Sequence, residues 1–579
     1  MAEPDPANPA EIASKVALDK LHACIDAGGC FVLEAGAGAG KTYSLIDALQ
    51  RLLAERGAKL IRDHQQIACI TYTNVAKDEI EARTDRHLAI HSDTIHGFCW
   101  SILKDFQPHL RSLLPSIEKW PEAIGEAGGL KGQWVEYDLG FLRVDDAVAS
   151  LRHDDVLALM VACLAEPKFR RVLTSRYPIL FIDEYQDTDA GFVEALKSHF
   201  LDTGEGPLIG LFGDEWQKIY GDGCGKVAHP RLTVIGKQAN FRSTQAIVDP
   251  LNRMRPDLIQ MVRDPKAPGE AIVFHTNAWK GQRQGGSHWK GDVSPDAAHA
   301  YLEHTKAELG KSGWNFDPAH AKILMLTHNI LAKEQGYASI AAAFRNNDAF
   351  IKKEDPHIAY LVDIIEPACA AFVAKRYGAM FEALGTGAPP IASHGAKLAW
   401  AKTIARLLDL REIGDVGQVL DHLRACGHLR LPEKVEDRER DFAKLPPEPQ
   451  EGEVSWVSRL RKLRAVPYGE IIALDRYIDG LTPFATKHGV KGAEFENVLV
   501  VVGRGWNQYN FEQMLCWFEN GIPADKQDAF VRNRNLFYVA CSRPRRRLAV
   551  LFTQELSQPA LTTLTKWFGA DAIRPLPDI

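Results

Sequence analysis

The chain has 579 residues, 46% of them hydrophobic and 25% charged, with a formal net charge of −6. Such values are ordinary for a folded globular protein and exclude a polycation, so any nucleic-acid binding requires a local basic groove. The length predicts about three to five structural units. The ten cysteines form no CxxC pair, so we expect no zinc or iron–sulfur site and reduced thiols in the cytoplasm.

The N-terminus is acidic and Pro-rich, which is unlike a secretory signal. We find no apolar run close to the roughly 20 residues that span a bilayer, so no membrane association is expected.

Short runs of Val, Ile, Leu and Phe recur along the chain and are typical of buried parallel strands. One group lies at 31–33, 67–70, 179–182 and 208–212, and a second group lies at 323–326, 498–502 and 548–552. Two groups predict two α/β cores.

Between these runs, residues 101–175 and 341–477 have mostly helical patterns, for example 145–164, and are interpreted as insertions. Residues 431–453 are charged and Pro-rich, which predicts a mobile surface loop. Residues 279–291 are Gly-rich and basic with two tryptophans; an irregular solvent loop is favoured there over a nucleic-acid contact.

The most informative segment reads AGAGAGKT and directly follows the first apolar run. A glycine-rich turn before a helix directs backbone N–H groups and the helix N-terminus at a phosphate. Lys41 would reach the β- and γ-phosphate oxygens, and the Thr42 hydroxyl would bind Mg²⁺. The alternative is a chance Gly/Ala-rich turn, but the strand before it and the amphipathic stretch after it favour a nucleotide loop. The predicted loop comprises Ala35, Gly36, Ala37, Gly38, Ala39, Gly40, Lys41 and Thr42.

Two later strands end in polar residues. Asp183 and Glu184 follow the run 179–182, where Asp183 can hold Mg²⁺ and Glu184 can accept a proton from an attacking water. Gln217 follows the run 208–212, where it could contact a γ-phosphate or belong to an ordinary polar turn.

Eight segments, in the correct order, resemble the motifs of the UvrD/Rep/PcrA-like superfamily 1A DNA helicases, of which this chain looks like a compact, divergent member. They are AGAGAGKT (35–42), TYTN (71–74), TIHGF (94–98), DEYQD (183–187), GDEWQKIY (213–220), NFRST (240–244), TKHGVKGAEF (486–495) and YVACSR (538–543).

The resemblance implies an α/β fold with two RecA-like parallel-sheet P-loop domains, called 1A and 2A, that bind ATP and Mg²⁺ between them. Helical insertions, 1B and 2B, would interrupt both domains. We expect 1A at 1–100 and 176–235, 1B at 101–175, 2A at 236–340 and 478–579, and 2B at 341–477.

The resemblance also assigns roles in the nucleotide site. Arg242 and Arg543 would act as arginine fingers that reach the γ-phosphate from the second core, beside the catalytic residues Lys41, Glu184 and Gln217. Asp183 and Thr42 would hold Mg²⁺, and Gly492 and Glu494 would lie against the nucleotide, with Glu494 at its sugar.

For nucleic acid, the resemblance implies that aromatic rings stack on bases. Each predicted contact is also a plausible local hydrogen-bonding residue, and the basic run 545–547 is either a backbone contact or a solvated turn. The predicted nucleic-acid residues are Tyr72 and Tyr220 for stacking, and Thr73, Asn74, Thr94, His96 and His488 for backbone or sugar contacts.

Two features depart from the family pattern. The family usually carries a Gln upstream of the phosphate loop that recognises adenine, but the first Gln of this chain is Gln50. The selectivity for ATP over other nucleoside triphosphates therefore stays open. Tyr220 is followed by Gly221 rather than by the family's aromatic-Arg-Gly-Ala segment. The chain extends 36 residues beyond Arg543, so we expect any associated nuclease on a separate polypeptide.

Three functions compete. The leading hypothesis is a DNA-stimulated ATPase that moves 3′→5′ on single-stranded DNA and unwinds tailed duplexes. The second is an ATP-driven switch or helicase subunit that gates a separate nuclease, in repair or phage defence, without processive unwinding. An RNA helicase is the third and is disfavoured by the motifs.

Overall fold

The computed structural model describes most of the chain, and its described residues fall into two compact units. The units are Met1–Val273 with Asn510–Leu548 and Ser557–Ile573, and Phe274–Tyr509 with Ala549–Leu556 and Arg574–Ile579. The residues described are 8–137, 142–219, 221, 223–286, 289–325, 334–344, 348–385, 391–426, 430–449, 453–479, 482, 484–486, 493–504 and 509–579.

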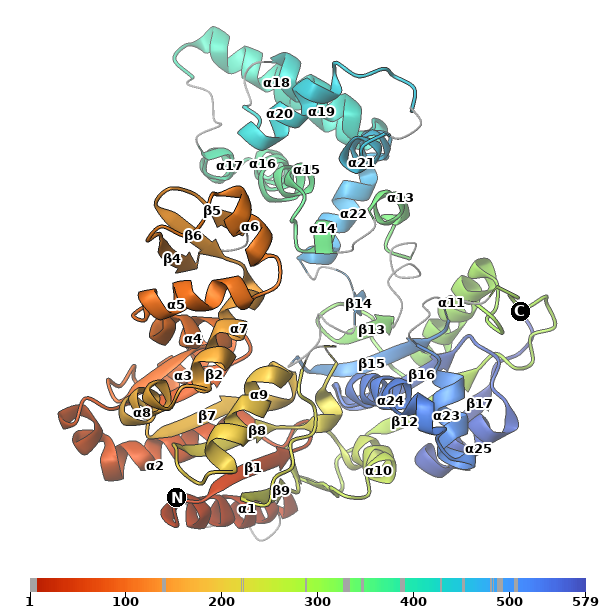
Figure 1. Cartoon of the computed structure of the whole chain (residues 1–579). Coiled ribbons are helices and arrows are strands. Elements are labelled where there is room, and N and C mark those ends of the chain that lie inside the picture. Colours follow the sequence, from red (N-terminus) through yellow and green to blue (C-terminus); the bar gives the residue numbers. More distant parts are fainter. Residues whose placement is uncertain are drawn as a thin grey trace. The chain divides into compact units, whose positions relative to one another are not determined.

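A six-stranded parallel sheet forms the centre of the first unit, in the order β3-β2-β7-β8-β1-β9 (Figure 1). In its register Glu34 lies opposite Gly213, and Asp183 lies opposite Phe212. The carboxyl ends of the strands therefore meet at one edge, where ligands bind in such sheets. The strands are β1 (Cys30–Ala35), β2 (Ile67–Thr71), β3 (Ile90–Thr94), β7 (Ile179–Asp183), β8 (Leu208–Gly213) and β9 (Leu232–Lys237).

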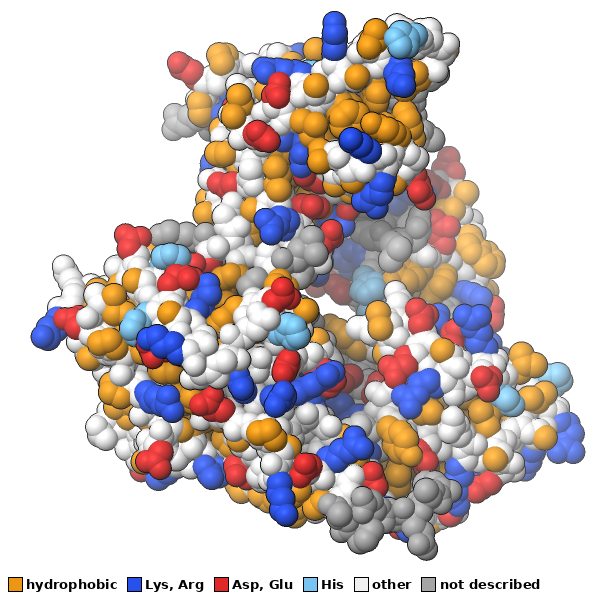
Figure 2. Space-filling view, turned by 180° about the vertical axis from the view of Figure 1, so that it is seen from behind, with side chains coloured by type: hydrophobic (Ala, Val, Ile, Leu, Met, Phe, Trp, Pro, Cys, Tyr) orange, Lys and Arg blue, Asp and Glu red, His pale blue; other side chains and the backbone are white. Residues whose placement is uncertain are grey.

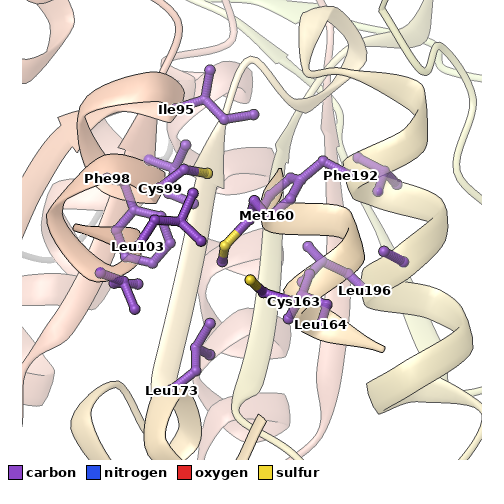
Figure 3. Packing of buried hydrophobic residues seen from close by; sticks show 14 of the residues in the cluster. Ile95, Phe98, Cys99, Leu103, Met160, Cys163, Leu164, Leu173, Phe192 and Leu196 are labelled. Atoms are coloured by element: carbon purple, nitrogen blue, oxygen red, sulfur yellow. The ribbon is translucent and has the colours of Figure 1, made fainter. Parts of the chain in front are cut away.

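Helices cover both faces of this sheet because successive strand side chains point to opposite sides. Phe31 and Leu33 pack in one hydrophobic cluster with α1 (Pro9–Asp26), α2 (Lys41–Arg62) and α3 (Asn74–Arg83). Val32 packs in the other, with α4 (Ile95–Leu103), α7 (His153–Leu164), α8 (Pro167–Arg176) and α9 (Ala190–Leu196). Figure 3 shows side chains of α4, such as Cys99, gathered with Met160 of α7 in this second cluster.

The first insertion contains a small sheet as well as helices. Helices α5 (Gln107–Leu113) and α6 (Trp120–Glu126) precede strands β4 (Trp134–Tyr137), β5 (Arg143–Val144) and β6 (Val148–Leu151), in the order β4-β6-β5. The prediction of a helix over 145–164 was therefore wrong in its first part. The backbone N–H of Arg152 donates to Asp155 Oδ2 at 2.8 Å, and this cap starts α7 only at His153.

A second six-stranded sheet has the order β14-β13-β15-β16-β12-β17, and β13 pairs in parallel with both β14 and β15. The prediction of two α/β cores is confirmed, while the four-part domain division stays a prediction. The strands are β12 (Glu270–His275), β13 (Ala321–Met325), β14 (Phe484–Thr486), β15 (Phe495–Val502), β16 (Pro544–Phe552) and β17 (Ile573–Pro575). The chain also contains β10 (Ala239–Asn240), β11 (Met261–Val262), α10 (Gln245–Met254), α11 (Pro295–Lys311), α23 (Phe511–Asn520), α24 (Gln527–Cys541) and α25 (Gln558–Phe568).

The second insertion is helical over its described residues. The charged segment 431–453, predicted as a loop, contains a helix, α20, because Glu439 is 1% exposed and pairs with Arg464 and His357. The helices are α13 (Ala338–Ala343), α14 (Asp348–Ile351), α15 (Pro356–Tyr360), α16 (Glu366–Val373), α17 (Tyr377–Leu384), α18 (His394–Ile413), α19 (Val416–Cys426), α20 (Glu433–Phe442), α21 (Ser455–Arg464) and α22 (Gly469–Ile478).

One stretch in this insertion, Ala349–Val373, is long and apolar enough to cross a membrane by length and composition. The expectation that no run approaches this length is corrected accordingly. More than half of the stretch, 56%, is buried inside the structure, and Ile358, Leu361 and Ile365 belong to the hydrophobic core of the insertion. These are the properties of a core helix.

Candidate nucleotide site

The phosphate loop runs from the end of β1 to the start of α2. Gly38 and Gly40 have φ angles of 74° and 76°, which favour glycine. A Cβ on Gly38 would come within 2.7 Å of Arg242 Cβ. Ala35, where the family has glycine, is the last residue of β1, and its extended backbone accepts a side chain. The helix starts at Lys41, so the free N–H groups of its first turn border the loop.

Residues around β10 and β11 hold the loop by its carbonyl oxygens. The Asn240 Nδ2 group donates to Ala37 O at 3.1 Å, and the Gln260 Nε2 group donates to the same oxygen at 3.2 Å. The backbone N–H of Phe241 donates to Gly38 O at 2.9 Å. Gln260 was missed by the sequence analysis, because no motif contains it.

A second lysine, Lys237, lies beside the loop and is fully buried at the end of β9. Its Nζ donates to Gly40 O at 3.0 Å and to Ser44 Oγ at 2.6 Å, so it fixes the junction between loop and helix. Burial lowers the pKa of Lys237 to about 8. Lys237 could not be predicted from the sequence, since its contacts depend on the pairing of β9 with β1.

The acidic pair and the loop lysine meet at the end of β7. Lys41 Nζ lies 2.9 Å from the carboxylate of Glu184, whose φ of 50° is left-handed. Asp183 is 5% exposed, and its buried Oδ1 has no hydrogen-bond partner among the described residues. Burial, and then the charge of Glu184, raise the pKa of Asp183. An oxygen donor of this kind fits Mg²⁺. The other predicted Mg²⁺ ligand, the Thr42 hydroxyl, lies in the first turn of α2.

No cluster of three or more His, Cys, Asp or Glu side chains suited to a metal ion occurs among the described residues. All ten cysteines are free thiols.

The turn after β8 and the residues before β16 also meet in this unit. Gln217 donates through Nε2 to Asp214 Oδ2 at 2.7 Å, and Arg543 Nη2 donates to Gln217 Oε1 at 3.3 Å. Arg242 Nη1 donates to Ser542 O at 3.3 Å. Burial, and then repulsion by Arg242, lower the pKa of Arg543 to about 9. Both predicted finger residues therefore belong to the compact unit that carries the phosphate loop.

The basic run 545–547 lies in β16 and is therefore not a turn, although the side chains of Arg545 and Arg546 are exposed to solvent. The Ser243 hydroxyl donates to Pro544 O at 2.7 Å, and the Thr244 N–H donates to Arg545 O at 2.9 Å. These bonds fasten NFRST to the segment that follows Arg543.

Two exposed aromatic side chains, for which no role was predicted, flank the end of the loop. Tyr43 is 49% exposed and Phe241 is 39% exposed. A Cβ on Gly40 would lie 3.7 Å from Tyr43 and 3.9 Å from Phe241. A signal was present, because one aromatic directly follows AGAGAGKT and the other lies inside NFRST.

The predicted nucleic-acid residues follow β2 and β3. Tyr72 is 40% exposed, and Asn74 is exposed at the start of α3. The hydroxyls of Thr73 and Thr94 accept the N–H groups of Ala76 at 3.2 Å and Gly97 at 3.3 Å. They therefore cap α3 and α4, as the local alternative predicted.

His96 stacks on His153 with ring centroids 3.4 Å apart. Burial, and then His153, lower the pKa of His96 to about 4, so its ring is neutral near pH 7. Glu494 lies exposed directly before β15 in the second unit, and its contact with the nucleotide sugar stays a prediction. Tyr220, His488 and Gly492 lie outside the described residues.

A phosphate loop, an acidic strand end and a glutamine–arginine pair on a parallel sheet define a P-loop nucleoside triphosphatase. The family model of the UvrD/REP helicase N-terminal domain matches residues 19–134 and 133–222. Over these residues the chain is similar to the UvrD-like helicases of superfamily 1, and its fold with two α/β cores is consistent with the two RecA-like domains of that family.

Three curated proteins are similar to the chain. Gabija protein GajB of Bacillus cereus (strain HuB5-5) is 22% identical over 678 positions, which cover 93% of this chain and 95% of that protein. Gabija protein GajB of Bacillus cereus (strain VD045) is 29% identical over 211 positions, covering 33% and 38%. The ATP-dependent DNA helicase UvrD1 of Mycobacterium leprae (strain TN) is 24% identical over 665 positions, covering 91% and 81%.

Proposed function

We propose that this chain hydrolyses ATP to move 3′→5′ along single-stranded DNA and to unwind tailed duplex DNA. The observation that carries the proposal is the meeting of motif residues in one compact unit. Lys41 pairs with Glu184 at the end of β7, and Gln217 pairs with Arg543 beyond the end of β8.

The ion pair between Lys41 and Glu184 suggests how nucleotide binding prepares hydrolysis. Loop N–H groups and Lys41 bind the phosphates. Lys41 then exchanges its carboxylate partner for phosphate oxygens, which frees Glu184 to accept a proton from the attacking water. Asp183 and Thr42 would hold Mg²⁺, which neutralises charge on the phosphate oxygens when bound.

Two arginines stabilise the charge that develops on the γ-phosphoryl group. The guanidinium groups of Arg242 and Arg543 are planar and suited to bidentate phosphate contacts. Gln217 contacts Arg543 and Asp214, so loss of the γ-phosphate would change the contacts of the turn after β8.

The base of the nucleotide stacks between Tyr43 and Phe241 beside Gly40. Stacking tolerates any base, since every base has a π-face. This arrangement fits a site without the upstream glutamine, and it predicts that other nucleoside triphosphates are accepted as well.

Single-stranded DNA passes the carboxyl ends of β2 and β3, where Tyr72 stacks on bases and Asn74 and His96 approach the backbone or sugar. Thr73 and Thr94 contribute by capping the helices that present these groups. The direction of movement rests on the family resemblance alone. We place the activity in the cytoplasm.

A second function, an ATP-driven switch or subunit that gates a separate nuclease, is favoured by the segment after Tyr220. Gly221 and Gly223 stand where the family carries a further aromatic residue, so the grip on single-stranded DNA would be weaker. Recovery of a nuclease with the purified chain, and ATP-dependent control of its cleavage, would support this alternative.

An unwinding assay tests the leading proposal. We expect ATP-dependent strand separation of a 3′-tailed DNA duplex, little separation of 5′-tailed or blunt duplexes, and none with Lys41→Ala. Intact ATP turnover without unwinding of the 3′-tailed duplex would refute the helicase proposal and favour the switch. Stronger activation by RNA than by DNA would favour the RNA alternative.

A further inference from the structure

A buried arginine outside the family motifs, Arg255, joins two parts of the nucleotide site. It lies at the end of α10, is 3% exposed, and donates through Nη1 to Asp214 Oδ1. Its Nη2 lies 3.5 Å from Glu34 Oε2, and its guanidinium lies 5.4 Å above the ring of Trp216. One side chain therefore contacts both the strand before the phosphate loop and the turn after β8.

Asp214 has no exposed surface, and it organises the turn that carries Gln217. Its Oδ1 accepts the N–H of Trp216 at 3.0 Å, and its Oδ2 accepts Gln217 Nε2 at 2.7 Å. A carboxylate so deeply buried needs a cationic partner. Arg255 supplies that partner.

The orientation of the Gln217 amide follows from this arrangement. Because Asp214 accepts from Nε2, the amide oxygen must face the other way, and it accepts from Arg543 Nη2 at 3.3 Å. Without Arg255, the side chain of Asp214 would lose the partner that holds its Oδ1, and the amide of Gln217 would lose its fixed direction.

The other end of the bridge lies at Glu34, the residue directly before Ala35. The hydroxyl of Tyr185, next to Glu184, donates to Glu34 Oε1. Arg255 thus connects the acidic strand end, the strand before the loop and the turn with Gln217 through buried hydrogen bonds and ion pairs.

We propose that Arg255 is a positioning residue for ATP hydrolysis, which acts on Gln217 through Asp214. The inference rests on the proposed function, since it assigns a role in hydrolysis. Arg255 contacts neither the loop glycines nor Lys41 in any described interaction. Its loss should therefore disturb the orientation of the Gln217 amide and leave nucleotide binding intact.

The test is a double-mutant cycle on steady-state ATP hydrolysis, with Arg255→Met, Gln217→Ala and the double variant. Misplacing a positioned group costs up to about 100-fold, so we expect Arg255→Met to lower kcat by about 10- to 100-fold and to leave KM within about twofold. Because both changes remove the same oriented amide, the double variant should be no slower than Gln217→Ala alone. Arg255→Lys should recover part of the lost kcat.

Two controls keep the test decisive. Arg263→Met changes an exposed arginine of the same unit and should hydrolyse ATP like the wild type. If Arg255→Met fails to fold, Arg255→Met with Asp214→Asn removes both buried charges and should show the same loss of kcat with KM retained.

The inference would be overturned if the fold-losses of kcat in the two single variants multiplied in the double variant. It would also be overturned if folded Arg255→Met kept the kcat of the wild type. Either result would leave the proposed function standing. Absence of hydrolysis by the wild-type chain would overturn both.

Discussion

At the scale of single residues, Glu184 carries the clearest chemical assignment, because its carboxylate and Lys41 Nζ lie 2.9 Å apart at the end of a buried strand. The pairing gives each residue a partner before nucleotide binds. Substitutions of the two residues should therefore have different effects on ATP binding and on hydrolysis.

We expect Glu184→Gln to bind ATP but to hydrolyse it at least about 100-fold more slowly, since a general base contributes roughly 10²- to 10⁴-fold. Binding persists because Lys41 is released from its ion pair. Titration calorimetry and steady-state turnover measure the two effects, and Glu194→Gln on the exposed part of α9 is the matched control. Near-normal turnover by Glu184→Gln would refute its role as the base.

The aromatic pair gives a second residue-scale prediction. Stacking on a base contributes about 1–3 kcal/mol, so Tyr43→Ala and Phe241→Ala should each raise KM for ATP by about 5- to 150-fold. The value of kcat should change less, because neither ring lies near Glu184 in any described contact. Tyr377→Ala, at an exposed tyrosine in the second insertion, should have no effect on KM. An unchanged KM in both ring variants would remove them from the base site.

At the scale of elements, the strands and their motifs could be predicted because parallel strands bring their carboxyl ends to one edge. Asp183, Glu184 and Gln217 could each be placed after a strand from the sequence, and the family resemblance assigned them to one nucleotide site. The roles of Arg255, Gln260 and Lys237 could not be predicted from the sequence, because their contacts depend on which distant elements pack side by side. The sheet β4-β6-β5 was missed since its strands are two to four residues long and precede a strong helix cap.

The helix α20 was missed for a related reason, which leads to a prediction on stability. Its charged residues read as a loop, yet Glu439 and Asp355 contact the 2%-exposed side chain of His357. Burial lowers the pKa of His357, but these two partners outweigh burial and the net shift is upward. A raised pKa in the folded state stabilises the fold fully below the unfolded value of about 6.5, and this stability is lost as pH rises through the folded pKa.

We therefore expect the wild type to melt at a higher temperature than His357→Gln, by a wider margin at pH 6 than at pH 8.5. Thermal denaturation at both pH values measures the margin. His394→Gln, at an exposed histidine of α18, should show no such pH dependence. A margin that stays constant or grows with pH would contradict the charged state of His357.

At the scale of the whole molecule, the surface charges can be compared with the composition. On the face seen in Figure 2, acidic and basic side chains are interspersed over the described residues, and the net charge of the chain is −6. Nucleic-acid affinity must therefore come from a local groove, and it should fall as salt is raised. The fold class followed from the sequence, because eight motifs in family order define it, whereas the substrate preference depends on residues that no motif fixes.

The central claim is that ATP hydrolysis in the first unit is coupled to single-stranded DNA. Steady-state ATP hydrolysis with and without single-stranded DNA tests it most directly, with Lys41→Ala as the blank. We predict weak turnover alone and strong stimulation by single-stranded DNA. Fast turnover that DNA does not change, or no turnover under either condition, would contradict the claim.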